Sequence, residues 1–359
     1  MLNGRVSRFA GAQVTPRLRS ISQPIFAAVL GIALGLVVAA ISGESPLVVL
    51  RILGKSSFGS PYDIGMSLFY ATPLIFTGLA VAIPFHAGMF NIGGEGQMTV
   101  GICAASAVGI LVPQFPSFVA IPLSLMTAVL VGGLWGALPG WMKARRGAHE
   151  VIATIMLNFI ASALTSWVTL GFLRNTETMN PETHSVGAGY LWGTLPGFGG
   201  SPLSAALILG LVVALIVHVV LWRTPLGFEV RAVGHSEQAA NFSGIDVGKT
   251  RIIAMALGGG MAGLAAVGEV FGNAGKFKLG FSADYGFTGI AVALLGRARP
   301  AGIVAAAILF GALHKGASDL DFETDHITRD LSLIMQSFVI IAVAADGLWT
   351  WRRQRKGTP

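Results

Sequence analysis

The sequence predicts an all-α, polytopic membrane protein, a bundle of about ten transmembrane helices with both termini in the cytoplasm. Hydrophobic residues make up 53% of the 359 positions and charged residues only 11%, and the mean hydropathy is +0.71. A soluble chain of this length would carry charge on roughly a quarter of its residues. The 48 dispersed glycines suit helices that pack closely in a membrane.

Ten apolar runs occur along the chain, most of them long enough to cross about 30 Å of hydrocarbon. The run at 284–296 is short, so it and the next run form either two spanning helices or one re-entrant pair, which would leave eight spanning helices. The runs are 24–41, 68–85, 95–112, 118–139, 151–173, 203–222, 251–270, 284–296, 300–316 and 331–348.

The charges between the runs predict the orientation, because loops rich in Lys and Arg stay in the cytoplasm. Arginines precede the first run, and the loops that then fall outside, 174–202 and 317–330, are rich in Asp and Glu. Residues 1–23 and 351–359 become basic cytoplasmic segments around a transmembrane domain at 24–350. The net charge of +7 follows from this orientation, so nucleic acid is not expected as a partner. The basic exceptions are Arg51, Lys55, Lys276 and Lys278.

The longest polar stretch assigned to the cytoplasm between runs is 223–250. Pro225 and Gly227 interrupt the preceding helix, and Ser236 is placed to cap a helix of about two turns that Gly244 ends. Such a helix has no lipid to bury. It is therefore either a solvated connector or a surface that a partner protein receives.

The string FNIGGEGQ at 90–97 places three glycines beside Glu95 and Gln97 at the start of the third run. Irregular backbone with polar groups near membrane depth often lines a cavity. Alternatively, it is a cytoplasmic turn in which these side chains cap the next helix. Asn91 shares this ambiguity, and Asn158 must hydrogen-bond within the bundle because an unpaired amide in hydrocarbon costs several kcal/mol.

An internal echo links FTGLAVAI at 76–83 to FTGIAVAL at 287–294. Internal repeats are common in transporters, with the site at their interface. Both copies run from outside to inside in the predicted topology, which makes them a parallel repeat. The candidate translocation-pathway residues are Phe76, Thr77, Asn91, Glu95, Gln97, Asn158, Phe287 and Thr288.

Three strings resemble the branched-chain amino acid and simple sugar permease superfamily of ABC importers, most closely its nucleoside and simple-sugar permeases. They are TPLGFEVRAVGHSEQAANFSGI at 224–245, FNIGGEGQ at 90–97 and EVIATIMLNFIA at 150–161. The first includes a pattern similar to the EAA-type coupling loop, with Gln238 where Glu is usual and Glu237 one place earlier. The resemblance extends over about 65–350, and the first 60 residues carry little of it.

The resemblance implies the permease subunit of an ABC importer in a bacterial inner (plasma) membrane, carrying a small polar solute, a nucleoside before a simple sugar. It implies three partners: an ABC ATPase subunit, a second permease chain in a hetero- or homodimer, and an extracytoplasmic binding protein that docks near 174–202. The chain itself would hold no cofactor, metal or catalytic residue. The implied ATPase-coupling residues lie within 231–244 and are Arg231, Ser236, Glu237, Gln238, Ala239, Ala240 and Gly244.

Two other functional classes fit the sequence less well. An ion-coupled secondary transporter of a small polar solute would bury coupling carboxylates or histidines in its helices, and Glu95 is the nearest candidate. An integral membrane enzyme would need a reactive cluster, and the sequence shows no HExxH motif or nucleophile elbow. The string GIDVGKT at 244–250 departs from a phosphate-binding loop in its glycine spacing and follows no predicted strand.

Overall fold

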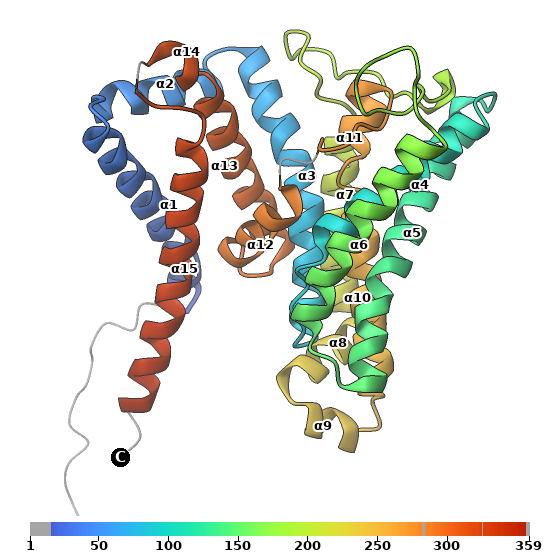
Figure 1. Cartoon of the computed structure of the whole chain (residues 1–359). Coiled ribbons are helices and arrows are strands. Elements are labelled where there is room, and N and C mark those ends of the chain that lie inside the picture. Colours follow the sequence, from blue (N-terminus) through green and yellow to red (C-terminus); the bar gives the residue numbers. More distant parts are fainter. Residues whose placement is uncertain (1–15, 282–283, 325, 357–359) are drawn as a thin grey trace, which may run out of the picture.

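The computed structural model describes residues 16–281, 284–324 and 326–356. Within these ranges the chain is helical, with no strand beyond isolated bridges, and all ten predicted runs form helices (Figure 1). The α-helices are α1 (Pro16–Ile41), α2 (Pro46–Phe58), α3 (Pro61–His86), α4 (Gly94–Leu111), α5 (Ser117–Arg146), α6 (Glu150–Gly171), α7 (Ala206–Arg223), α8 (Pro225–His235), α9 (Glu237–Phe242), α10 (Val247–Gly263), α11 (Val267–Glu269), α12 (Tyr285–Leu295), α13 (Pro300–Ser318), α14 (Leu320–Glu323) and α15 (Leu331–Lys356); Ala188–Tyr190 is a 3-10 helix and Val270–Ala274 a π-helix.

Seven helical segments of the described chain are long and apolar enough to cross a membrane. α12 is too short to do so, because its 11 residues extend over only about 16 Å. Its partner in the predicted re-entrant pair, α13, is itself one of the seven, and the number of crossings stays a prediction. The seven segments are Gln23–Ile41, Pro61–His86, Ser117–Arg146, Glu150–Gly171, Ala206–Arg223, Val247–Ala274 and Pro300–Glu323.

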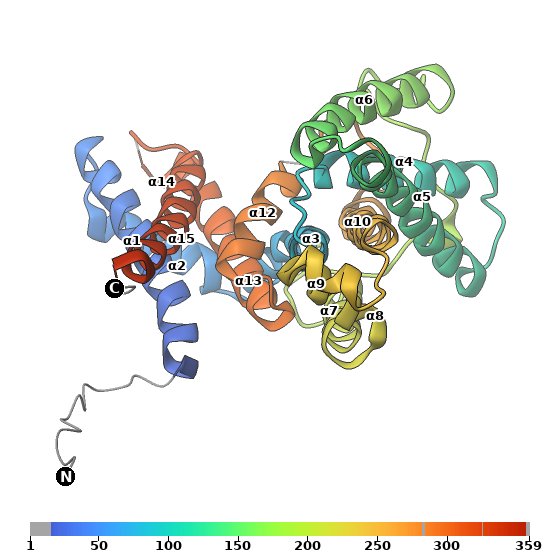
Figure 2. The same cartoon turned by 90° about the horizontal axis from the view of Figure 1, so that it is seen from below.

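The helices form two groups with α3 between them. α10 packs against α5, α4 and α3 in one group, and α1, α2, α13 and α15 form the other (Figure 2). The N-terminal end of α1 and the C-terminal end of α15 lie on the side of the molecule where α8 and α9 project (Figure 1). Residues 1–15 of the predicted basic segment and 357–359 of the predicted tail lie outside the described ranges.

Glycines bring the backbones of α5 and α10 into contact. A Cβ atom added at Gly263 would lie 2.1 Å from the carbonyl oxygen of Ala128, and one added at Gly259 would lie 2.3 Å from that of Gly132. Such approach requires glycine on at least one of the two helices and a small residue on the other. The close packing predicted from the glycine content is therefore confirmed.

α3 and α12 run in the same direction, and the two copies of the echo pack against each other. His86 Nε2 lies 2.9 Å from Ala298 O, 212 residues further on, and Gly289 packs on Thr77 at the same separation. This register places Gly286 level with Leu74, near the middle of α3. The prediction that both copies run in parallel is confirmed.

Two of the basic exceptions to the predicted charge pattern lie on α2, an element that the hydropathy pattern did not predict. α2 is amphipathic: Val49, Ile52 and Leu53 are buried, whereas Arg51 and Lys55 are exposed. A third exception is compensated, because Lys276 lies 2.6 Å from the buried Glu182. These charges are thus compatible with the predicted orientation.

Candidate translocation and coupling sites

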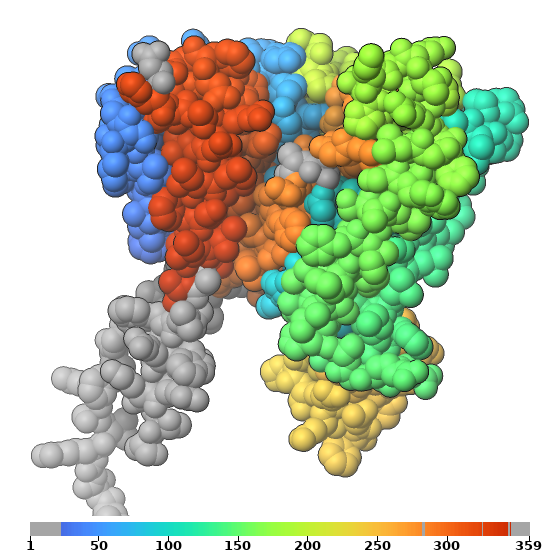
Figure 3. Space-filling model, in the orientation of Figure 1, coloured from blue at the N-terminus to red at the C-terminus, as the bar shows by residue number. Residues whose placement is uncertain are grey.

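A polar cavity of about 340 Å³ lies between α3, α12, α13 and α15. It extends from the level of Leu74, near the middle of α3, to Arg329 and Asp330 beside the start of α15. Figure 3 shows the front face hollowed between α15 and α6, with α12 in the floor of the hollow. The lining residues are Tyr70, Leu74, Asp284, Tyr285, Thr288, Phe310, His314, Ser318, Arg329, Asp330, Ser332, Leu333 and Gln336.

Two helices begin beside this cavity. Residues 87–93 are not helical, α4 begins at Gly94, and the backbone N–H of Gly286 in the first turn of α12 donates to Glu95 Oε2 at 2.8 Å. α4 then runs toward the 109–112 end and α12 toward Ala298. Broken helices that begin near the middle of the bundle, with polar groups at their ends, are typical of solute sites in transporters.

Amide side chains hold the irregular segment in place. Asn91 and Gln97 exchange two hydrogen bonds of 2.9 and 3.0 Å, and Asn91 also donates to Ala80 O. Asn158 in α6 accepts from Gly96 N at 2.9 Å and donates to Ile92 O at 3.0 Å. The helix-loosening interpretation of 90–97 is therefore supported, while Asn91 and Gln97 are fully buried within the chain.

The predicted pathway residues take different places around the cavity. Thr288 lines the cavity. Phe287, the residue before it in α12, is 44% exposed. Phe76 and Thr77 are fully buried, Phe76 against Gly210 of α7 and Thr77 against Gly289 of α12. Asn91, Gln97 and Asn158 fix the backbone that leads into α4, and Glu95 joins that backbone to α12.

Sequence reasoning missed most of the cavity, because its residues come from distant parts of the chain. The rings of Tyr70 and His314 meet edge to face with centroids 4.5 Å apart. Gln336 is 6% exposed on α15. Only the polar character of these residues within apolar runs marks them in the sequence, and polar groups in membrane helices are often functional.

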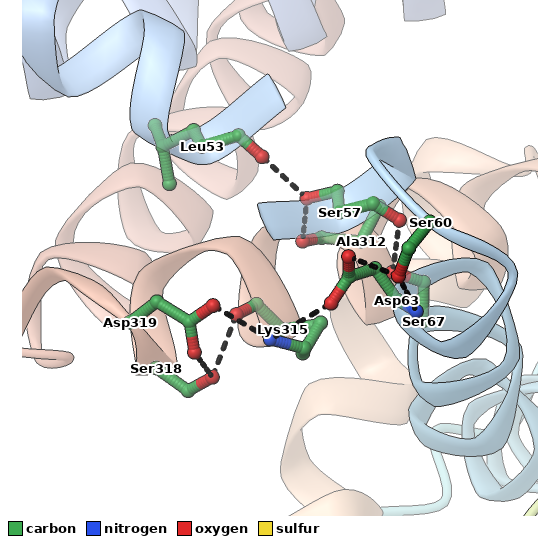
Figure 4. A network of polar contacts seen from close by, with 9 residues as sticks. All are labelled: Leu53, Ser57, Ser60, Asp63, Ser67, Ala312, Lys315, Ser318 and Asp319. Atoms are coloured by element: carbon green, nitrogen blue, oxygen red, sulfur yellow. Dashed lines mark hydrogen bonds and ion pairs between the residues drawn. The ribbon is translucent and has the colours of Figure 1, made fainter. Parts of the chain in front are cut away.

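A polar network around the buried Lys315 joins three helices on the same side as the cavity mouth (Figure 4). Lys315 Nζ in α13 lies 2.8 Å from Asp319 Oδ2 and 3.5 Å from Asp63 Oδ1 of α3. Ser57 Oγ of α2 lies 2.6 Å from the carbonyl oxygen of Ala312. The network fixes α2 and α3 to the end of α13. In the sequence, the only sign of this network is Lys315, a charged residue inside the apolar run at 300–316.

We expect Lys315→Met to destabilise the protein by about 2–3 kcal/mol, because Asp63 and Asp319 would lose the cation that neutralises them. The value is reduced for the partial exposure of both carboxylates. Thermal unfolding of the purified protein measures the effect. Lys55→Met removes an exposed lysine from α2 and is the matched control; an equal loss in both variants would contradict the assigned network.

The loops at 174–202 form a cap fixed to the segment that follows the π-helix. Lys276 Nζ and Thr178 Oγ1 both donate to Glu182 Oε1, at 2.6 and 3.0 Å, and the backbones of Thr183 and Phe277 are hydrogen-bonded. The hydrogen bond from Lys276 holds the pKa of Glu182 below its ordinary value. The cap is therefore stabilised by an ionised carboxylate.

The cap should weaken in acid. A carboxyl whose pKa is lowered by folding stabilises above its ordinary pKa of about 4.3, and this contribution is lost as the pH falls through the lower, folded value. The difference in Tm between the wild type and Glu182→Gln should be complete at pH 7 and shrink below about pH 4. Glu177→Gln, an exposed change in the same loop, should show no such dependence. A difference that stays constant down to pH 3 would contradict the assignment.

α8 and α9 project from the opposite side of the molecule as its lowest part (Figure 1). Thr224 caps α8 through Gly227 N, and Ser236 caps α9 through Ala239 N at 3.3 Å. Gly244, at φ +81°, ends this unit. The predicted cap and stop are confirmed, but 225–235 is itself a helix that begins at Pro225, so the predicted break begins a new helix.

Packing and one ion pair hold α9 on the helices above it. Ala240 is buried with Val233 and Val247. Glu237 receives two hydrogen bonds from Arg251 of α10, at 2.9 and 3.3 Å. A Cβ atom at Gly234 would lie 2.1 Å from the carbonyl oxygen of His86. α9 is therefore held against α10, and α8 is held against α3.

The tip of this unit is open to solvent. Gln238 and Ala239 are exposed, Arg231 hydrogen-bonds back to Gly227 O within α8, and Phe242 is 94% exposed. Phe242 is the most exposed large apolar side chain of α8 and α9, which makes it a candidate contact residue for a partner protein. In the sequence, Phe242 could have been identified as a candidate because it is an aromatic residue within the polar stretch 223–250.

Comparison with known proteins gives consistent matches over most of the chain. Residues 64–344 match the family described as the permease component of the branched-chain amino acid transport system. The chain is 36% identical to the guanosine ABC transporter permease protein NupP of Bacillus subtilis (strain 168), over 92% of this chain and 94% of the relative. It is 32% identical to the nucleoside ABC transporter permease protein NupB of Lactococcus lactis subsp. cremoris, over 91% and 92%. It is 30% identical to the glucose ABC transporter permease protein TsgB13 of Haloferax volcanii, over 92% and 88%.

Proposed function

The chain belongs to this permease family and is a multi-pass permease subunit of an ABC importer, a transport component rather than an enzyme; we propose that its solute is a nucleoside. The observation that supports a nucleoside as the solute is the 36% identity, over nearly the full chain, to a permease named for guanosine. The cavity is compatible with it, because hydroxyl, amide and aromatic groups line it together with charges of both signs.

A simple sugar is the second candidate, because the glucose permease relative is 30% identical over a similar length. A nucleoside carries ribose hydroxyls and a simple sugar carries pyranose hydroxyls. Polar side chains can recognise both through hydrogen bonds. An aromatic base would in addition stack on rings such as those of Tyr70 and His314. That difference favours the nucleoside.

The pathway is proposed to run through the polar cavity and between two permease chains. A single chain leaves the hollow beside α12 open, and Phe287 faces outward from that helix with 44% exposure. A second permease chain, identical or different, would close it. Phe76, Thr77, Asn91, Glu95, Gln97 and Asn158 would then act by holding the broken helices, and Thr288 by facing the solute.

ATP is proposed to act through α9. Closure of a partner ATPase would press on the exposed face of Glu237, Gln238 and Ala239, with Arg231 and Ser236 keeping the two helices in register. The contacts above α9 continue from Gly234 to His86 and from His86 to Ala298. Movement of the tip would thereby reach α12 and α13, which line the cavity.

The remaining assignments follow from the same orientation. The side that carries α8, α9 and both described ends would face the cytoplasm across the inner membrane of a bacterium. The capped outer loops at 174–202 would receive a solute-binding protein. The transmembrane domain would extend over 24–350, with basic segments at 1–23 and 351–359.

Co-purification of the tagged chain from its native membrane tests this proposal. We expect an ATPase subunit to be recovered with the wild type and lost when Glu237→Ala and Gly244→Val are combined. Uptake of labelled guanosine by cells should then be competed by nucleosides and not by glucose. Recovery of the chain without an ATPase, or competition by glucose alone, would overturn the coupling or the substrate, respectively.

A further inference from the structure

Two apolar grooves flank the beginning of α1 on the side where α8 and α9 project. One, of about 700 Å³, lies between α1, α12 and α15, and the other, of about 450 Å³, lies between α1, α12 and α13. Both include Pro24, Leu295 and Arg297 in their walls. Figure 2 shows the same side, with α1 and α15 next to α12 and α13.

Two arginines stand where the grooves meet. Arg297 belongs to both grooves and Arg299 to the smaller one, and both residues are exposed. Neither groove has a carboxylate among its described lining residues. Left-handed backbone at Arg297 (φ 54°) and Ala298 (φ 52°) makes a sharp turn, and the contact of Ala298 O with His86 Nε2 fixes it. The arginines are thus presented together, with no carboxylate among the described residues that line the two grooves.

A membrane offers one molecule that complements both features. Guanidinium groups bind phosphate oxygens in a bidentate manner, and basic pockets between membrane helices bind anionic head groups. The groove walls beyond the arginines are almost entirely Leu, Ala, Val, Phe, Ile, Pro and Gly. Free phosphate would use the arginines and leave these walls uncovered.

We propose that the turn at 296–299 and its two grooves bind one anionic phospholipid, with the phosphate on Arg297 and Arg299 and one acyl chain in each groove. The lipid would join α1 and α15 to the α12–α13 pair, and α12 and α13 also line the polar cavity. The site requires only that the chain lies in a membrane, so it does not depend on which solute is carried.

Native mass spectrometry of the purified transporter complex tests the site with phosphatidylglycerol and phosphatidylcholine of identical acyl chains. The wild type should prefer phosphatidylglycerol, and R297Q/R299Q should reduce that preference about 30-fold, since each basic residue near a membrane surface contributes about 1 kcal/mol. The matched control R145Q/R146Q removes two exposed charges from the end of α5 on the same side and should leave the preference unchanged.

A groove variant tests the acyl chains separately. Ala305→Trp places a large side chain in the smaller groove while keeping both arginines, and it should weaken phosphatidylglycerol binding, whereas Ala163→Trp on the exposed face of α6 should not. Equal binding of the two lipids, an equal effect of the control variants, or displacement by glycerol phosphate alone would overturn the proposal. So would a cross-link from position 305 to a second permease chain, which would show that protein covers the groove.

Discussion

Replacing Phe242 by alanine is expected to reduce ATP-dependent uptake at least about tenfold, because truncating a central aromatic residue of an interface often costs 2 kcal/mol or more of binding. Phe242 is 94% exposed at the tip of α9 and contacts little of its own chain. The amount of protein in the membrane and its Tm should therefore stay unchanged. Uptake of labelled nucleoside and pull-down of the ATPase subunit measure the two parts of this prediction.

The matched control is Phe118→Ala, a phenylalanine of similar exposure, 81%, at the opposite end of the molecule in α5. It should leave both uptake and ATPase binding at the level of the wild type. If Phe242→Ala retains full uptake, or if both variants lose it equally, α9 is not the surface through which the ATPase acts.

Replacing Gly263 by leucine is expected to prevent the protein from accumulating in the membrane in folded form. A Cβ atom there would lie 2.1 Å from Ala128 O and 2.9 Å from Ala128 C, so two backbones would have to separate. Overpacking of this kind costs about 3 kcal/mol or more, a large part of the usual margin of stability. Size-exclusion chromatography of the detergent extract measures the folded fraction.

Gly171→Leu provides the control, because Gly171 also lies in a membrane helix but a Cβ atom there meets nothing within 4 Å. It should give the wild-type yield. Normal yield and Tm for Gly263→Leu would mean that α5 and α10 do not pack with their backbones in contact.

Local and periodic signals account for the parts of the structure that the sequence predicted. Each apolar run became a helix because its length and hydropathy are properties of one segment. Ser236 and Gly244 fixed the start and end of α9, since caps act on neighbouring residues. The parallel direction of the two repeated strings could be predicted by comparing the strings and following the predicted order of crossings.

The parts that escaped prediction depend on contacts between distant segments. Gln336 and Tyr70 meet around one cavity only because α15 and α3 pack on α13. α2 is short and amphipathic, so its mean hydropathy does not mark it. Asn91 and Gln97 were assigned to the pathway from their polarity, whereas the structure shows them bonded to each other in a buried clasp; polarity identifies the region but not the direction of a side chain.

The most direct test of the account is transport by the complete complex in sealed liposomes, with the binding protein and labelled guanosine on one side and ATP on the other. Uptake that requires ATP on the side of α9, persists without any ion gradient and is lost in Phe242→Ala is the result that the account predicts. Uptake driven by a proton or sodium gradient without ATP would contradict it and establish a secondary transporter instead.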